Sequence, residues 1–106
     1  MAEPAYSSAA RAAVSTDRPE RYGKQLVSHL GRRHGGEWDS GNGTGWIDLD
    51  SGQAIVTAAE GVLLLRVTST SDEELTRLQE VVEQHLVRFG ERDDLSVTWE
   101  RDVNNA

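Results

Sequence analysis

The sequence contains no cysteine, a single lysine and no long apolar run. Without cysteine the chain can form no disulfide, no thiolate nucleophile and no cysteine-ligated metal site. The longest apolar run, Val62 to Leu65, is far shorter than the roughly 20 residues of a membrane span. The first residues also lack the basic start and leucine-rich run of a signal peptide. We therefore expect a soluble, cytoplasmic protein.

Basic residues are also scarce, since 18 acidic residues face 11 basic ones and the net charge is −7. Nucleic acids and anionic membranes attract clustered lysine and arginine, so neither is an expected partner. Arginine outnumbers lysine ten to one, which favours a bacterial source. The 106 residues fit one domain, which we place at residues 6–101, between flexible ends at 1–5 and 102–106.

Two amphipathic helices are predicted. The first begins at Asp17-Arg18-Pro19-Glu20, with Asp17 as N-cap and an early proline. Its apolar stripe contains Tyr22, Leu26, His29 and Leu30, with Val27 at the edge. The second begins at the capping box Ser71–Glu74 and ends at Gly90. Its stripe contains Leu75, Leu78, Val82, His85, Leu86 and Phe89.

Short alternating segments between turn residues predict six strands, at residues 6–14, 37–39, 45–49, 53–58, 62–68 and 95–100. Tyr6, Ala10, Ala12 and Val14 share one face of the first strand, and Leu95, Val97 and Trp99 share one face of the last. Short links such as Glu60-Gly61 indicate antiparallel neighbours. The order strand, helix, four strands, helix, strand predicts an α+β two-layer sandwich, with two helices on an antiparallel sheet.

Two polar patterns are interpreted as turns. Gly41 to Gly45 is rich in glycine, but a strand follows it, whereas a phosphate-binding loop requires the N-terminus of a helix. Asp39, Asp48 and Asp50 lack the spacing of a calcium loop. We interpret both as hairpin features, and His34 as a surface group at a helix end.

Two histidines are stronger candidates for a site. His29 and His85 each lie on the apolar stripe of their own helix, so helices packed side by side would bring the imidazoles together. Such a pair could bind a metal ion, with iron or zinc as candidates, or hold a proton. No HExxH spacing supplies further ligands, which favours a structural histidine bonded to a backbone carbonyl and no cofactor.

One face of the predicted sheet contains apolar residues that two helices cannot cover. These residues are Trp46, Ile55, Val62 and Leu64. Contiguous exposed apolar surface marks interaction sites, whereas scattered exposed apolar residues are normal. The favoured interpretation is a homodimer formed through this face; a different protein partner is the alternative.

Three segments carry a family resemblance: residues 21–30 (RYGKQLVSHL), 78–89 (LQEVVEQHLVRF) and 95–99 (LSVTW). With their spacing, they resemble the bacterial family catalogued as domain of unknown function 2218, over about residues 6–101. Gly23 stands where that family usually has a larger apolar residue, which implies a less well formed first helix. Gly90-Glu91-Arg92 replaces an aromatic-bearing stretch at the end of the second helix.

The resemblance implies a small bacterial α+β protein, and its loose association with siderophore utilisation implies an iron-related accessory role. Three functions therefore remain open. The first is a non-enzymatic binding or interaction module. The second is an accessory protein in iron, siderophore or other metal handling that uses His29 and His85. The third, ranked last, is an enzyme of unrecognised type, because no nucleophile and base are recognisable in the sequence.

Overall fold

The computed structural model describes residues 8–102, without the side chains of His34 and Arg92. Several predictions lie outside the described part: Tyr6, the flexible end at 1–5, the role of His34, and the predicted tail at 102–106 except for its first residue. The elements are β1 (Ser8–Ser15), α1 (Pro19–His34), β2 (Gly36–Asp39), β3 (Thr44–Asp48), β4 (Gly52–Ala59), β5 (Val62–Ser69), α2 (Asp72–Phe89), the one-turn 3-10 helix η1 (Glu91–Asp93) and β6 (Glu100–Arg101).

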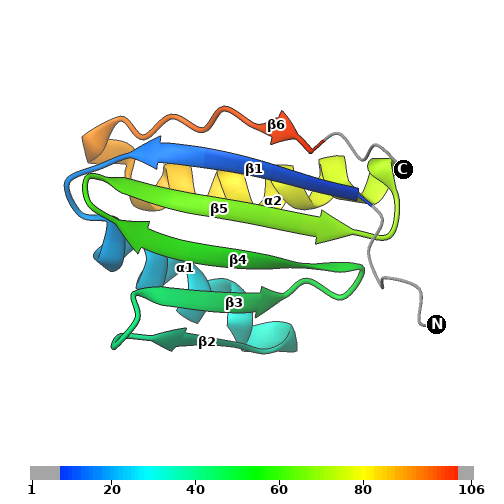
Figure 1. The fold of residues 1–106 in the computed structure, drawn as a ribbon, viewed down its shortest axis with the longest axis horizontal. Helices are drawn as coiled ribbons and strands as arrows, with labels where there is room; N and C mark the ends of the chain where they lie inside the picture. Colours follow the sequence, from blue (N-terminus) through cyan, green and yellow to red (C-terminus); the bar gives the residue numbers. More distant parts are fainter. Residues whose placement is uncertain (1–7, 103–106) are drawn as a thin grey trace.

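The strands form one antiparallel sheet in the order β2-β3-β4-β5-β1-β6. Both helices lie on the same face of it, α1 behind β2 to β4 and α2 behind β5 and β1 (Figure 1). The predicted α+β architecture and element order are therefore confirmed. No described helix is long and apolar enough to cross a membrane.

The core lies between the sheet and the helices. Side chains alternate along each strand, and those facing the helices are buried while their neighbours face outward. In β1 the buried residues are Ala10, Ala12 and Val14, as predicted. The core also contains Leu63, Leu65 and Val67 of β5 and Leu75, Leu78, Val82 and Leu86 of α2. The matched periods of strand and helix thus define a single core.

The two helix starts differ from each other. At α2 the predicted cap is confirmed, because the Ser71 hydroxyl accepts a hydrogen bond from the Glu74 backbone N–H at 3.2 Å. At α1 the prediction of Asp17 as N-cap is wrong. The N-cap residue is Arg18, and its N–H donates to the Thr16 hydroxyl at 3.1 Å. This local turn delays the helix by one residue, to Pro19.

Gly23 does not weaken α1, which continues unbroken through it. A Cβ atom at residue 23 would lie 2.8 Å from Cη2 of Trp38 and 3.2 Å from Cδ1 of Leu63. The indole from β2 therefore occupies the space that a side chain at residue 23 would need. The expectation of a poorly formed helix was wrong because a bulky neighbour compensates for the small residue.

The end of α2 follows the same pattern. A Cβ atom at residue 90 would collide with the side chain of Leu95, which is itself buried. Below it, the Tyr22 hydroxyl of α1 donates a hydrogen bond to Asp93 of η1. This bond is the first cause of a raised pKa of Tyr22, followed by burial. Gly90 therefore lets the chain after α2 fold back over the helix end.

The last predicted strand, residues 95–100, is corrected to two residues. Only Glu100 and Arg101 pair with β1. The prediction that Leu95, Val97 and Trp99 share one face is confirmed, since Leu95 is buried and Val97 and Trp99 are half-buried against the core. Residues 95–99 are held by side-chain contacts and not by backbone hydrogen bonds to a neighbouring strand of the described sheet. Leu95 covers Gly90, and the Trp99 indole N–H donates to Glu83 of α2 at 2.9 Å.

The start of the predicted C-terminal tail is bonded to the sheet. The backbone N–H of Asp102 donates to the Ala9 carbonyl at 2.9 Å. Its carboxylate pairs with Arg11 at 2.6 Å and with Arg66 at 2.8 Å. Both arginines project from the face opposite the helices, so Asp102 neutralises part of their charge.

Candidate functional site

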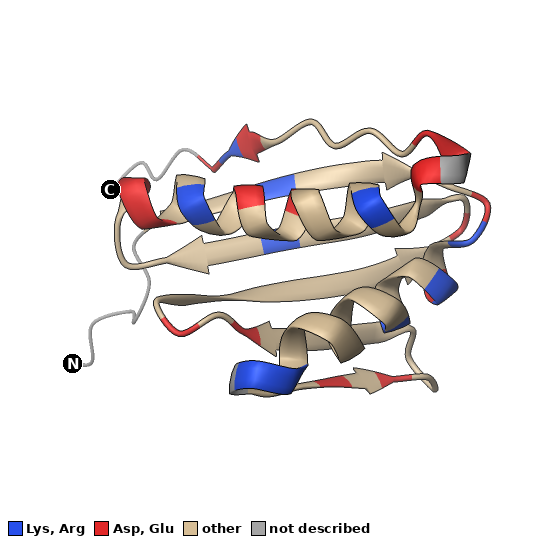
Figure 2. Cartoon of the chain, turned by 180° about the vertical axis from the view of Figure 1, so that it is seen from behind, with Lys and Arg blue, Asp and Glu red and all other residues tan. Residues whose placement is uncertain are grey.

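The helices enclose a cavity of about 460 Å³ on the sheet. We call it the interhelical cleft. Its lining combines basic and apolar side chains from both helices and from Leu49, which follows β3: His29, Leu30, Arg33, Leu49, Arg77, Leu78, Val81 and His85. The four polar side chains all come from the helices, and Figure 2 shows α1 and α2 running side by side across this face.

The two predicted histidines meet in the cleft. The ring centroids of His29 and His85 are 5.0 Å apart, with the planes tilted by 45°. Phe89 contacts both rings edge-on, at 5.3 Å from His29 and 6.4 Å from His85. His29 is exposed, although its position on the helical stripe predicted burial. Its ring contacts His85 and Phe89 of α2, so this position lies at the surface where the two helices meet.

His85 is fixed by its own helix. Its Nδ1 lies 2.7 Å from the Val81 carbonyl oxygen, which can only accept, so Nδ1 carries the hydrogen. This is the carbonyl-bonded histidine that the sequence favoured. The bond orients the ring and leaves Nε2 as the nitrogen open to a ligand or a proton. Within residues 8–102, no cluster of three or more histidine, aspartate or glutamate side chains is arranged to hold a metal ion.

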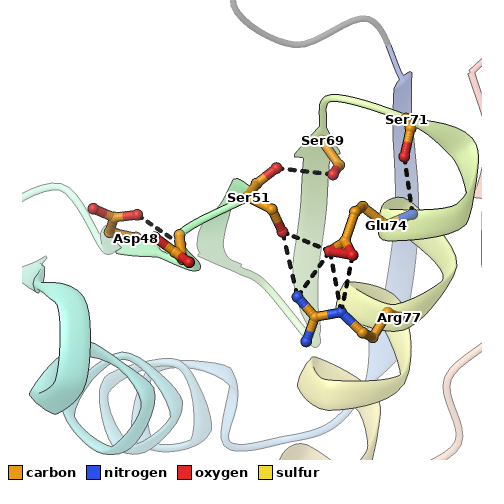
Figure 3. Close-up of polar contacts among 7 residues, drawn as sticks. Asp48, Ser51, Ser69, Ser71, Glu74 and Arg77 are labelled. Atoms are coloured by element: carbon orange, nitrogen blue, oxygen red, sulfur yellow. Dashed lines mark hydrogen bonds and ion pairs between the residues drawn. The ribbon is translucent and has the colours of Figure 1, made fainter.

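Arg77 stands at one end of the cleft in a hydrogen-bonded network (Figure 3). Its guanidinium donates to Glu74 through Nη2 at 2.8 Å and through Nε at 3.1 Å. The Ser51 hydroxyl donates to the same carboxylate at 2.7 Å. These bonds, from Arg77 first and then Ser51, lower the pKa of Glu74, and Glu74 in turn raises the pKa of Arg77. Buried Ser69 anchors the network by donating to the Ser51 carbonyl at 2.9 Å.

Arg33 is placed differently. It lies one turn after His29 on α1 and is exposed. It makes no ion pair or hydrogen bond with a described side chain. The cleft therefore contains one guanidinium held by a carboxylate, at Arg77, and one that is unpaired within the described residues.

The sequence interpretation missed both arginines, although a spacing signal was present. Arg33 follows His29 by four residues, and Arg77 precedes His85 by eight, with Val81 midway. Residues four apart share a helical face, so each arginine belongs to the face of its histidine. A search for basic residues at that spacing would have found them.

The acidic candidates form turns. Asp39 accepts from the Asn42 side chain at 2.7 Å and from the Gly41 N–H at 3.0 Å, and the Asn42 side chain is the first cause of its lowered pKa. Asp48 accepts from the Asp50 N–H at 2.9 Å, where Asp50 has a φ of 72°. Gly43, with a φ of 64°, completes the β2–β3 hairpin. The interpretation of both patterns as turn features agrees with these contacts.

The face of the sheet opposite the helices carries the other candidate residues. Trp46 is 45 % exposed and Leu64 is 41 % exposed, while Ile55 and Val62 are half-buried. A groove of about 320 Å³ crosses this surface between β1, β4 and β5. Ile55, Leu64, Arg66 and Arg11 all line it. The four predicted residues therefore share one face, which we call the outer face.

Comparison with known proteins gives a family and a fold. None of the curated proteins matches the chain. A solution structure of PA4090 from Pseudomonas aeruginosa, determined by NMR, is 24 % identical and superimposes with a TM-score of 0.73. The match covers 89 % of this chain and 96 % of that one, and at this identity it shows a shared fold. A family model described as uncharacterized proteins conserved in bacteria matches residues 11–100, so the chain belongs to the bacterial family DUF2218.

Proposed function

We propose that this protein is a non-enzymatic binding module whose interhelical cleft takes a small organic anion with an apolar body. The observation that carries the proposal is the lining of the cleft, where two guanidinium groups and two imidazoles surround apolar side chains. Its volume of about 460 Å³ is that of a typical small-molecule site. Leu30, Leu49 and Leu78 would contact the apolar part of the ligand.

The charges of the cleft favour an anion. Guanidinium groups bind carboxylates and phosphates through paired hydrogen bonds, and an unpaired one is the better donor. Arg33 meets that condition among the described residues, while Glu74 holds Arg77 in position. His85 presents Nε2 because Nδ1 is already bonded to Val81. With the hydrogen on Nδ1, Nε2 of the neutral ring is an acceptor, so the donors to an anion are the two guanidinium groups.

Binding is a better match than catalysis for this set of residues. The described side chains that line the cleft are imidazoles, guanidiniums and aliphatic groups, without a hydroxyl or a carboxylate among them. Nucleophilic catalysis needs a nucleophile beside its base, and a histidine base is usually oriented by a carboxylate. The lining instead offers hydrogen-bond donors above an apolar floor, which is the composition of an anion-binding pocket.

Isothermal titration with benzoate and phenyl phosphate tests the proposal, with benzyl alcohol as the neutral probe of similar shape. Arg33→Gln should weaken the binding of either anion by about 10-fold, the usual effect of losing one charged hydrogen bond. Arg32→Gln is the matched control, because Arg32 is the exposed neighbour that does not line the cleft. Equal affinity for benzyl alcohol, or equal loss in both variants, would contradict an anion site.

Metal handling is the second candidate, and the meeting of His29 and His85 at 5.0 Å is the observation in its favour. Two imidazoles supply half of a tetrahedral zinc site, and the neighbouring guanidiniums would repel a cation. Titration of the protein with Zn²⁺ and Fe²⁺ separates the two functions. Micromolar binding that disappears in both His29→Ala and His85→Ala would favour a metal site over an anion site.

A further inference from the structure

The outer face contains a row of directly opposed residues that crosses all six strands. The strand registers place one member on each strand from β2 to β6: Glu37, Trp46, Ile55, Arg66, Arg11 and Glu100. The row therefore has an acidic residue at each end, on β2 and on β6, with an apolar part on β3 and β4 and a basic part on β5 and β1 between them. The apolar and the basic parts lie next to each other in the middle of the sheet.

Apolar side chains flank the basic part of the row. Leu64 and Ala13 lie opposite each other on β5 and β1, and Thr57 lies beside them on β4. All three line the groove of the outer face together with Arg11 and Arg66. The helices cover the other face of the sheet, so no described element shields these side chains (Figure 1).

We propose that the outer face pairs with the outer face of a second copy of this chain, through a two-fold axis that runs along β4. Such an axis places Ile55 against the same residue of the other subunit. It places Trp46 opposite Arg66 of the partner subunit, where an arginine over an indole ring gains a cation–π contact. It also places Glu37 opposite Arg11 of the partner subunit, and symmetry forms each of these pairs twice.

Like charges count against two of the other axes. An axis along β5 would oppose Arg66 to the partner's Arg66, which is repulsive. An axis between β4 and β5 would oppose Glu37 to the partner's Glu100, which is also repulsive. The net charge of the chain is −7, but the outer-face row contains two basic and two acidic residues. Asp102 already pairs with both arginines of the row, so the proposed contacts with Glu37 and Trp46 of the partner subunit add to ion pairs that exist within each copy.

The size of the face is sufficient for a weak dimer. The six strands have 4, 5, 8, 8, 8 and 2 residues across the sheet, and at about 3.3 Å per residue and 4.8 Å between strands they give a face of roughly 550 Å². Specific interfaces bury about 800 Å² on each partner, and smaller ones are typical of transient complexes. Two such faces stack in an aligned sandwich at about 10 Å, with the small twist between sheets that is usual for them. We therefore expect association that depends on concentration.

Sedimentation equilibrium at roughly 100 µM protein and physiological salt tests the pairing. The unmodified chain should contain dimer, and Leu64→Arg should lose it while its circular dichroism stays native. Glu37→Arg and Arg11→Glu should each lose the dimer alone, because each opposes like charges twice. A mixture of the two variants should recover it, because both contacts in the mixed dimer are then between opposite charges.

Recovery in the mixture also excludes misfolding as the reason for the loss in the single variants. Glu60→Arg is the matched control, since Glu60 lies exposed in the β4–β5 turn outside the row, and it should leave the dimer unchanged. A chain that is monomeric throughout, or two variants that do not associate when mixed, would overturn the proposal. Because the cleft lies on the other side of the sheet, neither result bears on anion binding.

Discussion

Gly23 and Trp38 provide a test of how this fold compensates for a small residue inside a helix. An alanine at residue 23 would place its Cβ 2.8 Å and 2.9 Å from two ring carbons of Trp38. Real side chains do not approach so closely, so the indole or the β2 strand must move. Overpacking of this kind costs about 1–3 kcal/mol. Alanine also removes the roughly 1 kcal/mol helix penalty of glycine, which acts in the opposite direction.

The expected sum is a loss of about 0–2 kcal/mol in the free energy of unfolding for Gly23→Ala. The sign should reverse when the ring is smaller. In a Trp38→Phe background the two indole ring carbons that would clash with the new Cβ are absent. Gly23→Ala should then stabilise the protein by about 0.4–1 kcal/mol. Trp38→Phe itself removes an indole N–H that is buried without a hydrogen-bond partner among the described residues, which limits its own cost.

Urea denaturation of the four proteins in this double-mutant cycle measures the coupling between residues 23 and 38. A coupling of about 1 kcal/mol or more, favourable in the double variant, is the expected result. An identical effect of Gly23→Ala in both backgrounds would refute the steric argument. Gly23 would then be explained by something other than the indole of β2.

Three further substitutions test individual contacts. Ser71→Ala should lower the free energy of unfolding by about 1 kcal/mol, because it removes the cap on the Glu74 N–H, and urea denaturation would show no change if that bond were unimportant. Leu78→Ala should cost about 2–5 kcal/mol, since Leu78 is 2 % exposed, and an unchanged midpoint would remove it from the core. The pKa of Glu74 is lower in the folded protein than its ordinary value of 4.5. Ionised Glu74 therefore stabilises the fold at pH values above 4.5, and this contribution is lost as the pH falls through the lowered pKa. The stability difference between the unmodified chain and Glu74→Gln should therefore shrink from about pH 6 to about pH 3, and a constant difference would argue against the Arg77 contact.

The predictions that succeeded were those in which one local pattern determines the structure. Ser71 caps α2, and the three acidic side chains that follow it favour the start of a helix at this point, because negative charge stabilises a helix N-terminus. The alternation in β1 and β5 fixes which residues are buried, because a slip by one residue would reverse the faces. In each case the sequence contains both partners of the interaction within a few residues.

Apart from the N-cap of α1, where a local turn at Thr16 decided the start, the predictions that failed depended on partners distant in the sequence. Residues 95–99 have the alternation of a strand, yet the Trp99 indole bonds to Glu83 of α2 and only Glu100 and Arg101 reach β1. An alternating pattern shows which side chains are buried. It is the same for a strand paired through its backbone and for an extended segment held only by its side chains. Gly23 was interpreted from its own helix, whereas its explanation is an indole 15 positions later on β2.

The cleft shows how far such reasoning extends to a site. The meeting of His29 and His85 followed from two helical stripes that had to pack on one sheet. Arg33 and Arg77 lie four and eight residues from the histidine of their own helix and so share its face, but arginine on a helix is ordinarily solvated, and the spacing alone does not show that these faces line a cleft. The packing of α1 beside α2 shows it, because Arg33 and Arg77 then line one cleft while Arg32 lies outside it. Charge inside a cleft is therefore a property of helix packing, and it becomes visible only when both helices are placed together.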